Sequence, residues 1–199
     1  MKPRDIELMF EISAFRGMPR AWGHWLGPQT ANHAEHSFRV ALYALMIAKA
    51  EKKGNHEKIL KMALMHDLPE SRCSDVDYVQ RFYVTRNEDL ATQDVFADTV
   101  LHDEAIVILK EYHERKTIEA KIVKDADYLD IDVELREQIV RGQQSLEKDQ
   151  VPMRKDRIYP RLYTKTAKKL FTEIHKANPH AWHQNAQRNR FNGGDWQKK

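Results

Sequence analysis

Apolar residues recur at helical spacing along almost the whole chain, and this pattern constrains the fold more than any other feature of the sequence. Between residues 35 and 53, for example, Phe38, Ala41, Leu42, Leu45 and Ala48 fall on one face of a helix. Glycine is scarce, with 7 residues among 199, and runs of β-branched residues are short. Because the chain is long enough to bury a sizeable core, we predict one all-α domain of six or more helices.

Turn-forming residues divide this pattern into segments. Gly17 and Pro19 close the first helix, Gly54 ends the second, and Asn55 can cap the third. Residues 20–32 are expected to be irregular, and residues 75–86 carry no clear pattern. The predicted helices span residues 5–16, 35–53, 55–67, 90–112, 117–143 and 159–177. We expect the domain to occupy residues 1–180, and a basic C-terminal tail, in part disordered, to follow at 181–199.

The positive charge of the chain is concentrated near its C-terminus. The formal net charge is +3, and residues 176–199 alone hold five basic residues and one acidic residue, which makes +4. The remainder is therefore nearly neutral, at about −1, which argues against a broad surface for polymeric nucleic acid. Cys73 is the single cysteine, no apolar run is long enough to span a membrane, and the N-terminus does not resemble a signal peptide. We expect a cytoplasmic protein without a membrane partner.

One stretch, "KMALMHDLPE", ends an apolar helical face in His66 and Asp67, with Glu70 three residues on. Taken alone, a polar helix end explains these residues. However, His36 lies in the first turn of the preceding predicted helix, and a short turn at Gly54 makes the two helices antiparallel neighbours. His36 can then meet His66 and Asp67. Imidazole and carboxylate groups held on rigid helices are ligands for a divalent metal ion.

A fourth ligand has to come from elsewhere in the chain, and the segment "IVKDADYLDID" offers four aspartates. Ile122, Leu129 and Val133 define its inward face. Asp125 and Asp132 share the spacing of that face, whereas Asp127 lies on its flank. Spacing alone therefore leaves the choice of aspartate open. The candidates are Asp125, Asp127, Asp130 and Asp132.

Three segments, "AEHSFRVA", "ALMHDLPE" and "KIVKDADYLD", together resemble the HD-domain metal-dependent phosphohydrolases, and more narrowly the branch of the 5′-deoxynucleotidases. The similarity covers roughly residues 22–135, with a weaker match at "LYTKTAKKLF". The His-Asp pair in "LHDEA", at His102 and Asp103, lacks the surrounding pattern. The resemblance implies a single HD-type helical bundle. It also implies a ligand set, which is His36, His66, Asp67 and Asp127.

The same resemblance implies roles for residues around the metal. Glu70 and Asp75 correspond to catalytic carboxylates that position or activate water, although Ser74 replaces the usual glycine before Asp75. Arg20 and Trp22 correspond to residues that hold the phosphate and pack against the nucleotide, although Ala21 separates them here. Arg39 and Lys124 are further candidates for the phosphate clamp. Trp25 is assigned to the core or an interface.

The resemblance implies a metal-dependent enzyme that removes the 5′-phosphate from (deoxy)nucleoside monophosphates, the water being activated by the metal and a carboxylate. The alternative is hydrolysis of nucleoside triphosphates or other phosphoesters at the same site, and a helical binding module without activity is a third reading. The cofactor is a divalent ion, with Co, Mn, Fe, Zn and Mg all open. The resemblance also implies a small nucleotide and a second copy of the chain as partners, and Trp182 and Trp196 near the C-terminus give only a hint of an interface.

Overall fold

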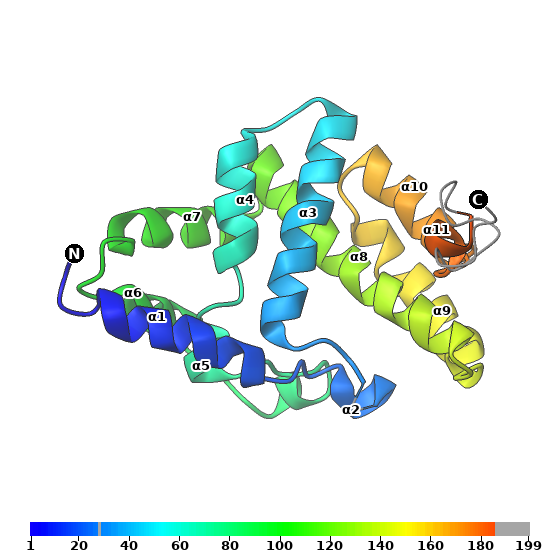
Figure 1. Ribbon diagram of the computed structural model, residues 1–199, viewed down its shortest axis with the longest axis horizontal. Helices are drawn as coiled ribbons and strands as arrows, with labels where there is room; N and C mark the ends of the chain where they lie inside the picture. The colour runs from blue at the N-terminus through cyan, green and yellow to red at the C-terminus, as the bar shows by residue number, and fades with distance from the viewer. Residues whose placement is uncertain (28, 186–199) are drawn as a thin grey trace, which may run out of the picture.

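Two long helices, α3 (His33–Glu51) and α8 (Ile118–Val140), pack against each other at the centre of the computed structural model (Figure 1). The structure describes residues 1–27 and 29–185, and within these ranges there is no β-strand. The predicted all-α fold with six or more helices is confirmed. The other α-helices are α1 (Asp5–Ala14), α2 (Gly23–Leu26), α4 (His56–Met65), α5 (Glu70–Cys73), α6 (Glu88–Phe96), α7 (His102–Glu114), α9 (Ser145–Arg157), α10 (Lys165–Ile174) and α11 (Ala181–Gln184). Short 3-10 turns lie at Phe15–Gly17, Gln80–Phe82 and Tyr159–Arg161.

Helices α3 and α4 lie side by side and are joined by a tight turn at the top of Figure 1. A capping box starts α3, because Asn32 and Glu35 each accept a hydrogen bond from the backbone N–H of the other. Gly54 turns the chain with a φ of +84°, and a Cβ there would lie 2.9 Å from Ile59 Cδ1. The Asn55 side chain then caps α4. This turn brings the start of α3 beside the end of α4, as expected.

The main core lies where α3, α4, α8 and α10 meet. It is built from fully buried side chains such as Val40, Ile59, Ile122 and Phe171. Burial of each large apolar side chain contributes about 1.5–3 kcal/mol, so this cluster fixes the relative positions of the helices that carry the candidate ligands. A second cluster packs α1 against α6 and α7, and it is formed by Leu8, Phe15, Val95, Phe96 and Leu109.

The prediction of one helix over residues 90–112 is wrong, since α6 and α7 are separate. The chain turns between them at Asp98, which has a φ of +55°. Thr99 Oγ1 donates to the Phe96 carbonyl at 2.7 Å, and the Val100 N–H donates to Asp5 Oδ1 on α1 at 2.8 Å. These polar contacts end α6 without interrupting the apolar spacing, so periodicity could not reveal the break.

Other boundaries also differ from the prediction. Helix α9 was not predicted, because its sequence is polar and carries Pro152 in its interior. The last predicted helix, over residues 159–177, is shorter, because Thr164 caps α10 and a 3-10 turn precedes it. The expectation of disorder in the tail concerns residues 186–199, which lie outside the described residues. Among the helices described, none combines the length and the apolar character needed to cross a membrane.

Candidate active site

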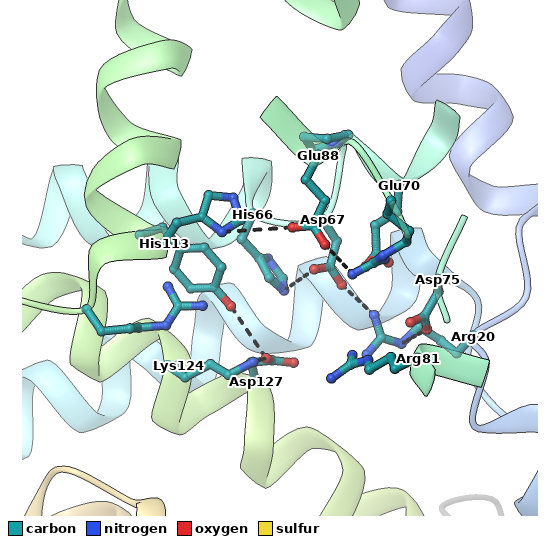
Figure 2. Close-up of a pocket in the computed structure, with 14 residues that line it drawn as sticks. Arg20, His66, Asp67, Glu70, Asp75, Arg81, Glu88, His113, Lys124 and Asp127 are labelled. Carbon is teal, nitrogen blue, oxygen red and sulfur yellow. Dashed lines mark hydrogen bonds and ion pairs between the residues drawn. The ribbon is translucent and has the colours of Figure 1, made fainter. Parts of the chain in front are cut away.

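The four predicted metal ligands lie together where the first turn of α3, the end of α4 and the middle of α8 meet. His36 Nε2 lies 3.3 Å from His66 Nε2 and 3.4 Å from Asp67 Oδ2. It also lies 3.3 Å from Asp127 Oδ1. Figure 2 shows His66, Asp67 and Asp127 around one cavity. Two imidazole nitrogens and two carboxylates therefore face a common small space.

The second nitrogen of each imidazole is held by the protein. His36 Nδ1 lies 2.7 Å from Asp130 Oδ2, and His66 Nδ1 lies 2.7 Å from the Ala63 carbonyl oxygen. Both acceptors require N–H at Nδ1, which leaves the lone pair of each Nε2 for the cluster. Asp130 is fixed in turn by Arg39, whose Nε and Nη2 donate to it at 2.6 and 2.8 Å. Arg39, a candidate for the phosphate clamp, is engaged with Asp130 and does not line the cavity of Figure 2.

This donor set fits a divalent cation. Two atoms bonded to one ion at about 2.0–2.2 Å lie roughly 3.0–3.5 Å apart. The donor atoms of His36, His66 and Asp67 lie close enough together to share one ion, and Asp127 Oδ1 has this spacing to His36 Nε2. Burial and Arg20 oppose protonation of His36, yet its hydrogen bonds with Asp127, Asp130 and Asp67 raise its pKa to about 10. The cluster thus attracts positive charge, and a cation bound there would replace the proton on His36.

The structure shows a different role for each of the four candidate aspartates, which spacing alone could not distinguish. Asp125 accepts hydrogen bonds from the backbone N–H groups of Tyr163 and Thr164, each at 2.8 Å, and so joins α8 to the start of α10. Asp132 accepts from the buried guanidinium of Arg154 on α9. Asp130 supports His36, and only Asp127 lies in the ligand cluster. The aspartate indicated by the resemblance is therefore the one that lies beside His36 Nε2, the nitrogen that faces the cluster.

Glu70 lies at the start of α5, beside the cluster and facing the same cavity. Its Oε1 accepts a hydrogen bond from Arg86 Nη1 at 2.9 Å, and its Oε2 lies 3.6 Å from His33 Nδ1. Burial, together with the carboxylates of Asp67 and Asp75, raises the pKa of Glu70. Its Oε2 is buried and has no hydrogen-bond partner among the described residues. One carboxylate oxygen is therefore anchored and the other has no hydrogen bond within the described part of the protein.

Arg20 and Asp75 close the side of the cluster nearest the N-terminal segment. The Arg20 guanidinium is buried and forms an ion pair with Asp67 (Figure 2). Asp75 Oδ2 lies 3.7 Å from Arg20 Nε and accepts a hydrogen bond from the Ala21 N–H at 2.9 Å. Burial opposes ionisation of Asp67, but His66 and Arg20 hold its pKa well below the usual range. Arg20 thus reaches the cluster although Ala21 intervenes before Trp22.

Two cavities meet at the cluster. The first is polar, has a volume of about 120 Å³ and is lined in part by His66 and Asp67. The second is about 200 Å³ and has aromatic walls from Trp22, Trp25 and Tyr78. Trp25 stacks on Tyr78 with ring centroids 5.2 Å apart. Its side chain is 39% exposed, so of its two assignments the core is wrong and an interface stays a prediction. The walls that the two cavities share are Arg20, Asp75, Arg81, Lys124 and Asp127.

Several residues of these cavities were not found from the sequence. Tyr78, Arg81 and Arg86 come from the segment that carried no helical pattern, so there was no periodicity to orient them. Arg115 follows the end of α7 and gives no motif signal. Lys124 was a candidate for binding phosphate, and its Nζ lies 2.6 Å from Asp127 Oδ2 on the same helix.

Fold and site together define the class of protein. The sequence model of the HD domain family matches residues 15–174, and the chain belongs to that family. The resemblance indicated by the His, His-Asp and Asp motifs is therefore confirmed.

Individual relatives agree with this placement. The zebrafish (Danio rerio) protein named 5′-deoxynucleotidase HDDC2 is 28% identical over 138 residues, which cover 66% of this chain and 68% of that protein. A conserved hypothetical protein from Pyrococcus furiosus superposes with a TM-score of 0.70 at 25% identity, covering 87% of this chain and all of that one. The PH0347 protein from Pyrococcus horikoshii superposes with a TM-score of 0.67 at 27% identity, covering 86% and 98%.

Proposed function

We propose that this protein is a metal-dependent phosphohydrolase that removes the 5′-phosphate from nucleoside monophosphates. The observation that carries this proposal is the junction of two unlike cavities at the His-Asp cluster. A polar space suited to phosphate shares part of its wall with a second space that several aromatic side chains line. A nucleoside monophosphate has the same two parts in the same order, a dianion joined through a sugar to an aromatic base.

In this proposal His36, His66, Asp67 and Asp127 hold the divalent ion. When bound, such an ion neutralises charge on the phosphate and makes water a stronger nucleophile at neutral pH. Asp130 and the Ala63 carbonyl keep both imidazoles in the tautomer that leaves Nε2 available. Arg20 balances the negative charge of Asp67 and Asp75, and, although burial opposes ionisation, His66 and Arg20 together hold the pKa of Asp67 well below its usual range.

Glu70 is the residue we assign as the general base. Arg86 anchors its Oε1, while Oε2 is free to accept a proton from the attacking water. Burial and the neighbouring carboxylates raise the pKa of Glu70, and so they make it a stronger base than an ordinary carboxylate. Asp75 faces the same cavity and lies next to the shared wall, where it can orient the water or a sugar hydroxyl. Lys124 and Arg20 are placed to contact phosphate oxygens.

The aromatic cavity is assigned to the nucleoside. A base can stack on Trp22 or on the Trp25–Tyr78 pair, as stacking on an aromatic face tolerates any base. The relative named as a 5′-deoxynucleotidase supports a deoxyribonucleotide as the substrate. A homodimer and a cytoplasmic location remain part of the proposal on the basis of the resemblance.

The decisive experiment measures phosphate release from ribo- and deoxyribonucleoside mono- and triphosphates with Co²⁺, Mn²⁺, Mg²⁺, Fe²⁺ and Zn²⁺. We expect metal-dependent release from monophosphates. Release from triphosphates alone would contradict the proposal. The absence of both turnover and bound metal would instead favour a binding module. Asp67→Ala provides a direct test of the ligand set, because full metal content in that variant would show the assignment to be wrong.

A further inference from the structure

Arg115 follows the last residue of α7 and has a left-handed backbone with a φ of +53°. This conformation is uncommon for residues other than glycine, and a residue held in it at the rim of a site is a candidate for a functional role. The guanidinium carbon lies 3.3 Å from the centroid of the Tyr112 ring, over its face. The Tyr112 hydroxyl in turn lies 3.4 Å from Asp127 Oδ2. Arg115 is thus packed one side chain away from the ligand cluster.

The charge of Arg115 has no counterpart in the part of the chain that the structure describes. Its Nη1 is buried and without a hydrogen-bond partner, and no ion pair involves its guanidinium. Other cations around the polar cavity do have carboxylate partners: Arg20 pairs with Asp67 and Lys124 with Asp127. Likewise, Arg86 pairs with Glu70 and Glu88. A buried guanidinium nitrogen without an acceptor is costly, and a bound anion would supply the missing acceptor.

Arg115 and the ligand cluster line the same polar cavity, whose volume is about 120 Å³. An anion that fills the space between the cluster and the wall formed by Arg115, Tyr112 and Lys124 contacts both. Arg81 is a second arginine without a carboxylate partner in the described residues, but it is exposed, and its Nε donates to the Val76 carbonyl at 2.9 Å. Arg115 is therefore the better placed of the two to bind an anion.

We propose that Arg115 is a phosphate-binding residue, which donates Nη1–H to a non-bridging oxygen of the phosphate at the His-Asp cluster. This inference rests on the proposed phosphohydrolase function and adds a residue to it. Stacking on Tyr112 fixes the plane of the guanidinium before phosphate arrives, so little side-chain entropy remains to be lost on binding. Arg20 then serves mainly to neutralise Asp67, and Arg115 supplies the cation that no carboxylate shares.

The test is equilibrium binding of inorganic phosphate, measured by calorimetry on the full-length protein in the presence of Mn²⁺. We expect Arg115→Gln to weaken phosphate binding about 10- to 100-fold, as removal of a hydrogen bond to a charged group does. Lys116→Gln is the matched control. Lys116 is the next residue, is exposed, and pairs with Glu114 outside the cavity, so its loss removes the same charge without touching phosphate. Equal phosphate affinity in the two variants would overturn the proposal.

Arg115→Gly separates binding from folding. Glycine suits the left-handed backbone at this position, so we expect an unchanged or higher melting temperature together with the same loss of phosphate affinity. If phosphate affinity stays normal in this variant, the proposal is wrong.

A second measurement asks which phosphate group of a nucleotide Arg115 contacts. It compares KM of the wild type and of Arg115→Gln for a nucleoside monophosphate and for a nucleoside diphosphate. A raised KM for the monophosphate in Arg115→Gln supports contact with the reacting phosphate, and a change confined to the diphosphate contradicts it.

The role of Arg115 and the proposed enzyme activity would fail in different experiments. Turnover of nucleotides with unaltered phosphate binding in Arg115→Gln removes only the role of Arg115. Arg115-dependent phosphate binding without turnover of any nucleotide removes only the proposed enzyme activity.

Discussion

Each imidazole of the candidate metal site donates from one ring nitrogen to the protein and presents the other to the cluster. For His36 the acceptor is Asp130, which is buried and held by both Nε and Nη2 of Arg39. The sequence indicated His36 through its motif but offered Asp130 only as one of four candidate ligands, because support of a ligand depends on a contact between α3 and α8. Asp127 was likewise chosen by resemblance and not by spacing, since both Asp125 and Asp132 fit the inward stripe better.

Replacement of Asp130 tests this supporting contact. We expect Asp130→Asn to lower metal affinity about 10- to 100-fold, because the amide cannot fix the tautomer and orientation of His36 as a carboxylate does. Metal content after dialysis against graded free Mn²⁺ measures the effect. Asp125→Asn is the control on the same helix. It should cost about 1–3 kcal/mol of stability through the cap of α10 and leave metal affinity unchanged.

The role of Glu70 can be distinguished from that of the metal ligands, because its replacement should affect turnover and not metal binding. We expect Glu70→Gln to keep the metal and to lower kcat about 10²- to 10⁴-fold, because the amide cannot accept the proton of the attacking water. Metal analysis and phosphate-release kinetics on the same preparation give both readouts. Glu104→Gln is the control. Glu104 lies on α7 in an exposed ion pair with Lys61 of α4, so its loss should change neither metal content nor kcat. Wild-type turnover in Glu70→Gln would remove Glu70 from the mechanism.

At the scale of elements, helices that bury an apolar face were predicted from periodicity, and the others were not. Helix α9 is joined to α8 by Arg154, a fully buried side chain paired with Asp132, and by a small apolar contact through Leu146. One ion pair and one buried leucine give no apolar stripe for a periodicity search to find. The break between α6 and α7 is likewise polar, as it depends on Asp98, Thr99 and a contact with Asp5. Both features require tertiary partners that a local pattern does not contain.

An ion pair between elements makes part of the stability depend on pH. Glu11 on α1 accepts two hydrogen bonds from Arg72 on α5, at 2.8 and 2.9 Å, and these lower the pKa of Glu11 below its usual value of 4.5. The ionised form therefore stabilises the fold above pH 4.5, and this contribution is lost as the pH falls through the lowered pKa. We expect Glu11→Gln to lower stability at pH 7 by up to about 1 kcal/mol and to have little effect at pH 3. Urea unfolding at the two pH values checks this, and an equal effect at both would contradict it.

At the scale of the whole molecule, the proposed ligands join parts of the chain that are far apart in sequence. His36, His66 and Asp127 come from three helices, and an ion bound by all three cross-links the centre of the bundle. Because the unfolded chain does not hold these groups together, metal binding adds to the stability of the folded state.

Removal of the metal should therefore destabilise the protein. At a free metal concentration 100 times the dissociation constant, the linkage contribution is about 2.7 kcal/mol, which corresponds to a fall in Tm of roughly 5–10 °C on chelation for a chain of this size. Thermal melts with Mn²⁺ and with EDTA measure this difference. Asp67→Ala should melt at one temperature in both buffers, and a metal-dependent shift retained in that variant would contradict the proposed ligand set.

The two cavities share an inner wall but have separate outer walls, and this has a consequence for how such a protein can diverge. The ligands and Glu70 lie around the polar cavity, whereas Trp25 and Tyr78 line only the aromatic one. Tyr78 lies in a segment without regular helix, where substitutions disturb few packed neighbours. Descendants of one ancestral gene can therefore acquire new substrate preferences through this outer wall while the hydrolytic machinery is inherited intact.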